Sequence, residues 1–454
     1  MRYLAALWIA KAARLFMRLL KYNATNYPGE LALKICPDFL GHIGKPKTII
    51  AVTGTNGKTT VSNLLCDTLE RDGKKILNNR LGSNIASGIS TSLIAGSDLF
   101  GKCRYDTAVL EIDERSAPRV YPYIKPDYII ITNLFRDSIM RNAHPEYIAG
   151  LLSRYIPATS KLISNADDLI SCRVAPQCSR VYFGLSRRPE DRTDCINLIN
   201  DMRTCPECGE RLRYEYLRYH HIGKAYCEKC GFRSPEYDYA GFDADLDKMT
   251  VRVRGHGGEG VYHLPSDSVF NTYNVTAVVA LLCEMGYTHE RLTRLMSDIQ
   301  IVTSRYSSEE KNGVRVIMQL AKDRNALACS RAFDYVTGLP GNKKIVTMMN
   351  NLGDEKHWSE NTCWMYDCDF EFLTREGVEL VVTSGPRAFD YRLRLLIAGV
   401  PEEKIVCVPN EADVSDNLDV RPGDRIFILH GTDSLGRANA IRKKIFEIAE
   451  EAAK

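Results

Sequence analysis

The stretch Ala51–Thr60 reads AVTGTNGKTT, and it directly follows the β-branched run Thr-Ile-Ile at residues 48–50. Apolar β-formers, then a glycine-bounded turn, then leucines at helical spacing predict a strand, a loop and a helix. In such a loop, backbone N–H groups and the helix N-terminus face an anion, so the pattern predicts a phosphate cradle. The spacing differs from the common GxxxxGK[ST] loop, because only two residues separate Gly54 from Gly57.

The side chains of this loop predict how a nucleotide would be held. Gly54 and Gly57 permit close approach of a phosphate, Lys58 supplies a mobile positive charge, and the hydroxyl of Thr59 can ligate Mg²⁺. The candidate nucleotide-binding residues of the loop are Gly54, Thr55, Asn56, Gly57, Lys58, Thr59 and Thr60. The competing interpretation, a glycine-rich turn with no ligand, leaves the lysine and both threonines unexplained.

The short loop GTNGKTT closely resembles the nucleotide loop of the Mur ligases and folylpolyglutamate synthases. Its flanks narrow the resemblance. YPGELALKICPDFL before the loop and NNRLGSNIASGI after it look like the MurT family, the synthetase subunits of lipid II isoglutaminyl synthases. The likeness continues through ITNLFRD at 131–137 and SGPRAFDYRLRLLIAGV at 384–400, so it covers the chain from Tyr27 to about Arg437.

Composition sets broad limits on the chain. Its 454 residues suffice for two or three domains, each with its own core. A formal net charge of +3 gives no bulk electrostatic reason to expect nucleic-acid binding. The 15 cysteines are scattered through apolar segments apart from one dense group, which favours a reduced cytoplasmic protein over a disulfide framework.

Polar residues follow several of the predicted strands. The apolar segment DTAVLEIDE at 106–114 ends in three carboxylates, Glu111, Asp113 and Glu114, where Mg²⁺ can be held directly or through water. Glu111 is the preferred ligand because it lies within the apolar run, whereas Asp113 also fits a solvated loop. Further polar residues follow strands at 128–132 and 161–164. This alternation predicts a doubly wound, mainly parallel α/β sheet.

The dense cysteine group reads Cys205-Pro-Glu-Cys208 and, after 18 residues, Cys227-Glu-Lys-Cys230. Two CxxC knuckles at this separation predict a closed, tetrahedral Zn²⁺ site of ribbon type over about 203–233. The segment between the knuckles is basic and aromatic, so nucleic-acid contact is an alternative role. The MurT-like resemblance implies an insertion in the central domain, and we therefore expect the zinc to stabilise that insertion and no nucleic acid to bind.

The resemblance also implies nucleotide contacts outside the loop. Segments like FNTYNV in Mur ligases contribute an asparagine near the base, which makes Asn271 and Asn274 candidates, although either could equally be a helix N-cap. Arg305 stands where these ligases carry an arginine after the hinge that approaches the phosphates. We expect a linker and helix at 1–46, an ATP-binding central domain at 47–304 and a smaller α/β domain at 305–454.

The C-terminal domain is the weakest part of the resemblance. The loop NNLGDEKHWSENTCWMYDCDFE at 350–371 keeps the family's Asp-x-Asp-Phe-Glu ending, but its earlier part is longer. The family implies that one aspartate here completes the active site of a glutaminase partner. Asp354, Asp367 and Asp369 are all candidates, and the sequence does not choose among them.

The first 21 residues predict an amphipathic helix. Lys11, Arg14, Arg18 and Lys21 form one basic stripe opposite an apolar stripe that includes Trp8. The segment is too interrupted by charge to span a bilayer. Two interpretations remain, a helix docked on the protein body and an interfacial contact with a membrane.

The MurT-like resemblance implies an ATP- and Mg²⁺-dependent amide ligase. Such an enzyme activates the α-carboxylate of D-glutamate in the lipid II stem peptide and amidates it, with ammonia from a class I, GatD-like glutamine amidotransferase in a heterodimer. We expect a cytoplasmic chain, with lipid II met at the inner membrane face. Alternatives are a ligase that adds an amino acid, as Mur and folylpolyglutamate enzymes do, and a non-catalytic, nucleotide-regulated zinc-ribbon binding protein.

Overall fold

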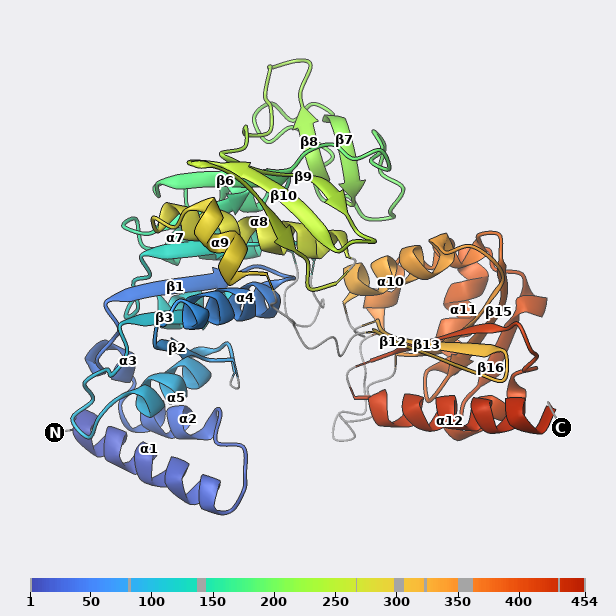
Figure 1. Ribbon diagram of the computed structural model, residues 1–454, viewed down its shortest axis with the longest axis horizontal. Helices are drawn as coiled ribbons and strands as arrows, with labels where there is room; N and C mark the ends of the chain where they lie inside the picture. The colour runs from blue at the N-terminus through green and yellow to red at the C-terminus, as the bar shows by residue number, and fades with distance from the viewer. Residues whose placement is uncertain are drawn as a thin grey trace. The chain divides into compact units, whose positions relative to one another are not determined.

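The computed structural model describes residues 2–80, 83–136, 144–266, 268–297, 306–321, 325–349, 362–431 and 433–452. The chain, coloured from end to end in Figure 1, divides into two compact units. The first comprises residues 1–135, 145–196 and 200–301, and the second 136–144, 197–199 and 302–454. Each unit has its own sheet and its own core. The domain boundaries expected from the sequence stay a prediction.

The helices of the first unit are α1 (Arg2–Leu19), α2 (Tyr27–Ile35), α3 (Phe39–His42), α4 (Lys58–Arg71), α5 (Ala86–Gly96), α6 (Ala117–Val120), α7 (Pro145–Tyr155), α8 (Val269–Glu284) and α9 (His289–Leu295), with 3₁₀ turns at Glu114–Ser116 and Ser171–Arg173. Its strands are β1 (Thr48–Thr53), β2 (Ile76–Asn78), β3 (Thr107–Glu111), β4 (Tyr128–Ile131), β5 (Lys161–Asn165), β6 (Arg180–Leu185), β7 (Arg213–Tyr219), β8 (Ile222–Tyr226), β9 (Tyr239–Asp245), β10 (Thr250–Gly255) and β11 (Gly258–His263).

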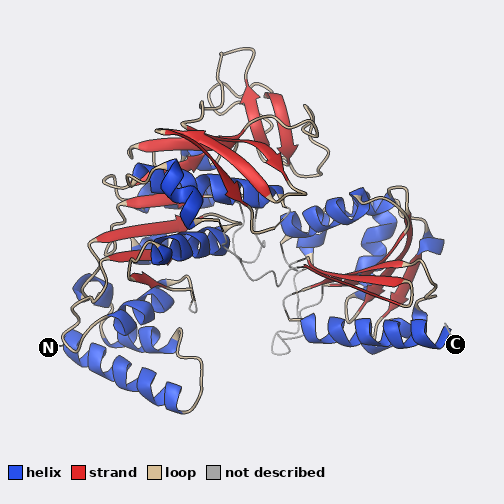
Figure 2. Ribbon diagram, viewed as in Figure 1, coloured by secondary structure: helices blue, strands red, loops and turns tan. Residues whose placement is uncertain are grey.

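A mostly parallel sheet forms the centre of the first unit (Figure 2). Among the described residues its strand order is β11-β10-β9-β6-β5-β4-β1-β3-β2, and only the β9–β10 and β10–β11 pairs are antiparallel. The strands β7 and β8 form a separate antiparallel hairpin. Because β1 lies between β3 and β4, the strand order reverses at β1. The carboxyl ends of these three strands therefore border the crevice where such sheets bind ligands.

Both faces of this sheet are covered by helices. Ile49 and Ala51 of β1 join a core with α1, α2, α3, α5, α6 and α7, while the alternate residues Ile50 and Val52 are buried on the face covered by α4 and α8. Strands that are buried on both faces read as continuous apolar runs, which is why β1 and β4 carry almost no polar residue. The predicted doubly wound arrangement is confirmed.

The second unit is a smaller α/β structure. Its strands are β12 (Tyr306–Lys311), β13 (Val314–Leu320), β14 (Lys343–Met348), β15 (Val378–Ser384), β16 (Ile405–Val408) and β17 (Arg425–His430), and its helices are α10 (Ala326–Gly338), α11 (Ala388–Ala398) and α12 (Leu435–Ala452), with 3₁₀ turns at Cys363–Tyr366, Phe370–Thr374, Glu402–Lys404, Glu411–Asp413 and Ser415–Asn417. Within the described part of this unit the sheet order is β12-β13-β17-β14-β15-β16, with β12 antiparallel and the other strands parallel. Helices α10 and α11 pack on one face and α12 on the other.

The helices α2 and α5 approach each other at Gly29, and this contact generates a prediction. A Cβ at Gly29 would lie 1.9 Å from the carbonyl oxygen of Ser87, whereas a Cβ at Gly150 in α7 would meet nothing within 4 Å. We expect Gly29→Ala to lower the free energy of unfolding by about 1–3 kcal/mol through overpacking. The control Gly150→Ala should raise it by about 0.5–1 kcal/mol, because alanine favours a helix. Urea unfolding measures both, and equal effects of the two variants would contradict the packing described.

Candidate functional site

The loop between β1 and α4 depends on its two glycines. Gly54 has φ +124°, and a Cβ there would lie 2.2 Å from the hydroxyl oxygen of Thr132. Gly57 has φ +91° and is the residue that precedes the first turn of α4. Both conformations are rarely adopted by other residues. The sequence therefore turns sharply at the end of β1, and the N-terminus of α4 opens at the carboxyl edge of the sheet.

The carboxylate of Glu114 joins the two ends of this loop. Its Oε1 accepts hydrogen bonds from the backbone N–H of Gly54 at 2.7 Å and from Nζ of Lys58 at 2.9 Å. Lys58 also donates to the carbonyl oxygen of Gly54. Burial opposes the charge on Lys58, but Glu114, then Glu111 and Asp113, outweigh it and raise the pKa of this lysine. Lys58 is thus held as a cation at the mouth of the loop.

Glu111, at the end of β3, faces the same loop. Its Oε2 accepts from the hydroxyl of Thr59 at 2.9 Å, and its Oε1 accepts from Nδ2 of Asn84 at 3.1 Å. The side-chain amide of Asn79 donates to the carbonyl oxygen of Glu111 and accepts from its backbone N–H. Octahedral Mg²⁺ with ligands at 2.0–2.1 Å places neighbouring oxygens about 2.9 Å apart. The Thr59 hydroxyl and the Glu111 carboxylate therefore fit two adjacent positions of such an ion.

The middle of the loop is fixed by the residues that follow β4. Asn133 accepts from the backbone N–H of Asn56 at 3.0 Å and donates to the carbonyl oxygen of Asn56 at 3.1 Å. The hydroxyl of Thr55 donates to the carbonyl oxygen of Phe135 and accepts from its backbone N–H. The side-chain nitrogen of Asn56 is buried and has no hydrogen-bond partner within the described chain. Thr60 is half-buried in the first turn of α4. The orphaned Asn56 donor fits an oxygen of a bound ligand.

The structure brings Asn274 to the loop. Its Oδ1 lies 2.5 Å from the position that a Cβ on Gly57 would take, so the amide packs directly against that glycine. Asn274 donates to Oδ1 of Asn271 at 3.1 Å, and Asn271 donates to the hydroxyl of Ser266. The N-cap of α8 is Ser268, whose side chain accepts from the N–H of Phe270. Neither asparagine is therefore that cap.

The four cysteines of the two knuckles converge. Their sulfur atoms lie within 4.8 Å of one another, with Cys205–Cys230 at 3.5 Å and Cys208–Cys227 at 3.6 Å. A tetrahedral ion with Zn–S bonds of 2.3 Å would separate its sulfurs by about 3.8 Å. In both knuckles the first cysteine's carbonyl oxygen accepts from a glycine N–H, of Gly209 or Gly231, at positive φ. Four thiolates in this paired geometry suit one zinc ion.

The hairpin that joins the knuckles is anchored in the first unit by a buried carboxylate. Asp167, just after β5, accepts from Arg218 of β7, and it also bonds the hydroxyl groups of Tyr216, Tyr237 and Tyr273. The side chain of Arg218 is 4% exposed and pairs with Asp191 as well. The polar residues that follow β5 therefore bind this insertion.

The same hairpin reaches the nucleotide loop through aromatic rings. The ring of Phe135 lies 4.6 Å from that of His221 and 6.1 Å from that of Tyr219, measured between centroids. His221 also pairs with Asp168, which accepts from the backbone N–H of Leu134 at 2.6 Å. Because the backbone N–H of Phe135 donates to Thr55, the insertion packs against a residue that holds the loop.

Similarity to known proteins can now be set beside this geometry. The family described as Mur ligase middle domain matches residues 52–184, and the family described as MurT ligase C-terminal matches residues 322–432. The MurT subunit of lipid II isoglutaminyl synthase from Staphylococcus aureus (strain COL) is 31% identical over 412 residues, which cover 89% of this chain and 90% of that protein. The chain belongs to the MurT family.

Other relatives agree with this family. The Streptococcus pneumoniae MurT subunit is 28% identical, with 90% of each chain covered. Among solved structures, a pseudomurein peptide ligase type C from Methanothermus fervidus aligns with a TM-score of 0.62 at 20% identity, covering 90% of this chain and 81% of that one. MurF ligase from Thermotoga maritima in complex with ADP gives 0.58 at 14% identity, covering 94% and 85%. These structural likenesses confirm the Mur ligase fold.

Two candidate residues of this MurT-family chain, Arg305 and Asp354, lie outside the described residues. Asp369 is 1% exposed, and its carboxylate accepts from the backbone N–H of Leu198 at 2.6 Å and from the amide of Asn197 at 2.9 Å. The side chain of Asp367 is 22% exposed and lies 3.8 Å from Arg136. These two aspartates and their three partners all belong to the second unit.

Sequence reasoning missed several residues of the site. Glu114 was noted only as one of three carboxylates, yet it is the partner of Lys58. Asn79 and Asn84 orient Glu111, and Asn133 fixes the loop. The sequence did carry a signal for Asn79 and Asn84, because both lie in the Asn-rich segment 78–89 that carries the MurT resemblance.

Proposed function

We infer that this chain is the synthetase subunit of a lipid II isoglutaminyl synthase, an ATP-dependent carbon–nitrogen ligase of peptidoglycan synthesis. The observation that carries this proposal is the 31% identity to a MurT subunit over about nine tenths of both chains. The reaction converts the D-glutamate α-carboxylate of the lipid II stem peptide into an amide. The substrate is lipid-linked, so the chain would act at the inner face of the membrane.

The chemistry needs positioning of phosphates more than a protein nucleophile. The γ-phosphoryl group of ATP is transferred to a carboxylate oxygen of D-glutamate, which yields an acyl phosphate and ADP. Ammonia then attacks the acyl carbon, inorganic phosphate leaves, and a proton is lost. In this scheme the N–H groups of the loop and the ammonium of Lys58 stabilise the charge that develops on the transferred phosphoryl group.

The remaining candidates would orient the nucleotide and its metal. Thr59 and Glu111 would hold Mg²⁺, which supplies neutralising charge at the phosphates. Asn274, packed against Gly57, and the neighbouring Asn271 would lie beside the nucleotide. Binding of ATP would require Lys58 to exchange its bond with the Gly54 carbonyl for a phosphate oxygen, while Glu114 keeps the ammonium charged.

The ammonia source would be a separate class I, GatD-like glutamine amidotransferase subunit in a heterodimer. An aspartate of the second unit would complete the partner's triad by orienting a catalytic histidine. Asp354, Asp367 and Asp369 stay candidates. The exposed fractions favour Asp367 over Asp369, since a carboxylate that is 1% exposed and already bonded to Asn197 and Leu198 is poorly placed to meet another chain.

The zinc would be structural. Four thiolates leave no open coordination position, so the ion would stabilise the knuckles without taking part in the reaction. The hairpin between the knuckles has its own anchor in Asp167 and Arg218, which does not involve the metal. The zinc therefore holds the tip of the insertion more than its base.

The first prediction concerns Lys58. We expect Lys58→Ala to lower ATP turnover by on the order of 10²–10³-fold, because a charge-stabilising donor is lost from the transition state. Glu114 is left buried without its partner in this variant, so Lys58→Met combined with Glu114→Gln removes both charges of this buried pair and guards against unfolding. Thr59→Ala should likewise abolish turnover, and Thr59→Ser should restore much of it.

The control for this series is Lys47→Ala. Lys47 stands just before β1, and its side chain is 89% exposed. It should keep full turnover and an unchanged melting temperature. ATP hydrolysis and thermal unfolding are measured together on all variants. ATPase activity at the wild-type level in folded Lys58→Ala would refute the assignment of the loop.

A second prediction concerns the metal. Elemental analysis should find one zinc per chain, and the double variant Cys208→Ser with Cys227→Ser should contain none. The control Cys103→Ser with Cys407→Ser should keep it, because neither cysteine belongs to the cluster. Hydrogen exchange in the zinc-free variant should rise over residues 203–212 and 226–234 and stay low in the loop 54–59. Zinc retained by the first double variant would contradict the proposed ligands.

A third prediction concerns the aspartates. Replacement by asparagine of the residue that orients the partner's histidine should lower glutamine-dependent amidation by on the order of 10²–10⁴-fold. Amidation with free ammonia should persist, because the ligase site is separate. Asp354, Asp367 and Asp369 are replaced one at a time, with the exposed Asp416→Asn as control. The proposal fails if all three variants keep full glutamine-dependent activity, or if each loss extends equally to free ammonia.

A further inference from the structure

The first helix, α1, packs on the protein body through a face made mostly of small residues, and its large apolar side chains face outward. Ala6, Leu7 and Ala10 are fully buried against the core that α1 shares with α2 and α5. The exposed apolar residues of the helix and its end are Trp8 (51%), Ile9 (46%), Leu15 (62%), Phe16 (63%), Leu19 (73%) and Leu20 (51%). Their spacing of seven and four residues places them on one continuous face. The apolar stripe that the sequence predicts, which includes Trp8, thus largely faces outward.

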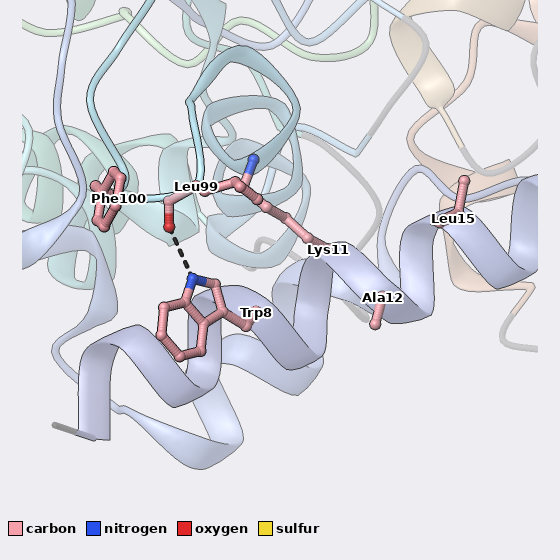
Figure 3. Close-up of a pocket in the computed structure, with 6 residues that line it drawn as sticks. All are labelled: Trp8, Lys11, Ala12, Leu15, Leu99 and Phe100. Atoms are coloured by element: carbon pink, nitrogen blue, oxygen red, sulfur yellow. Dashed lines mark hydrogen bonds between the residues drawn. The ribbon is translucent and has the colours of Figure 1, made fainter.

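A neighbouring loop extends this apolar face. An open hollow of about 460 Å³ is lined by Trp8, Lys11, Ala12, Leu15, Leu99 and Phe100 (Figure 3). The indole N–H of Trp8 donates to the carbonyl oxygen of Leu99 at 2.8 Å. Asp98 accepts from the backbone N–H groups of Phe100 and Lys102, both at 2.9 Å, which folds the loop into a tight turn. Leu99 and Phe100 stand at its tip, 64% and 75% exposed.

The charge around this face has one sign. Residues 2–21 contain five basic residues and no acidic one. Within the described chain Arg14, Arg18 and Lys21 form no ion pair. Burial lowers the pKa of Lys11, and the nearby Arg104 and Arg14 lower it further. Asp98 is the acidic group near Lys11, and it acts to raise the pKa of this lysine. By helical spacing Lys11 and Arg18 border the exposed apolar face, whereas the half-buried Arg14 lies on the side of α1 that contains Leu7 and Ala10, and the exposed Lys21 follows the end of the helix. The face is therefore apolar in its centre and electropositive along one border.

We propose that the outer face of α1 and the Leu99–Phe100 tip together form a docking surface for a lipid bilayer with anionic headgroups. The large apolar side chains would enter the boundary between headgroups and acyl chains, and the arginines and lysines beside them would bind lipid phosphates. Tryptophan suits such a position, because its ring is apolar while its N–H is satisfied, here by the Leu99 carbonyl. Among the described residues no helix is long and apolar enough to cross a membrane, so the contact would be peripheral.

The charge argues against a second copy of this chain as the occupant. Two such faces brought together would place the unpaired basic residues of both copies against one another, whereas anionic lipid phosphates complement them. This proposal rests on the proposed function and adds to it, because docking would bring the chain to its lipid-linked substrate. The vesicle assay below contains no substrate, so its failure would leave the ligase assays untouched, and failed ligase assays would leave vesicle binding intact.

The test uses flotation of the full chain, alone and with its glutaminase partner, on vesicles of phosphatidylcholine with and without phosphatidylglycerol. Binding should be strong with the anionic lipid, weak with phosphatidylcholine alone, and should fall as salt is raised. Arg18→Gln with Lys21→Gln should weaken binding by on the order of tenfold. Leu99→Ser with Phe100→Ser should abolish most of it at any salt concentration, because the loss is of apolar contact.

The matched control removes exposed apolar side chains elsewhere. Phe389 and Leu393 on α11 are 66% and 52% exposed, and Phe389→Ser with Leu393→Ser should bind vesicles like the wild type. All variants should keep the wild-type melting temperature and ATP turnover, since each replaces surface residues. The proposal is overturned if the chain binds no anionic vesicles, or if the α1 and tip variants bind as the wild type does. It is also overturned if these variants instead lose the glutaminase partner or self-association, which would assign the face to a protein.

Discussion

The carboxylate of Glu114 makes the contact on which the proposed nucleotide site depends. It lies just beyond the end of β3, and one of its oxygens accepts from both Gly54 and Lys58, at the first and last positions of the loop. The Glu114 carboxylate, the Lys58 ammonium and the Gly54 N–H therefore meet in one buried contact, where electrostatic interactions are strong. The geometry follows from strand order. β1 pairs with β3 in parallel, so the end of β3 arrives beside the loop that leaves β1.

A second constraint ties the zinc insertion to the same site. Asp167 and Asp168 follow β5 and bind the hairpin through Arg218, Tyr216 and His221. Asp167 also accepts from Tyr237 and Tyr273, which lie outside the hairpin. The hairpin in turn packs on Phe135, whose backbone bonds with Thr55 of the loop. Breaking a buried charge pair of this kind costs on the order of 3–5 kcal/mol. The insertion therefore packs against the residues that hold the loop, although the four-cysteine cluster lies in the knuckles and the anchor at Asp167 does not use it.

Much of the fold could be predicted from the sequence, because it rests on local patterns. The strands β13, β15 and β16, for example, are each an apolar run bounded by turn residues. The short β2 and the exposed β12 gave no such pattern. The loop 54–57 was predictable as a turn because backbone conformation requires its glycines, and its binding of phosphate stays a prediction. The partner of Lys58 was not, because three carboxylates stood at one strand end and only the tertiary structure decides which of them turns toward the lysine. Likewise, the helical periodicity of residues 2–21 predicted an amphipathic helix but could not say which side would face the protein.

The central claim is that this MurT-family chain activates a carboxylate of lipid II for amidation. Mass spectrometry of lipid II incubated with the chain, ATP and ammonia, and separately with ATP, glutamine and the glutaminase partner, tests it most directly. The account predicts the mass change of one carboxylate converted into an amide, located at D-glutamate and dependent on ATP in both reactions. With glutamine the change should also require the partner. Lipid II of unchanged mass, or a product enlarged by an added amino acid, would contradict it.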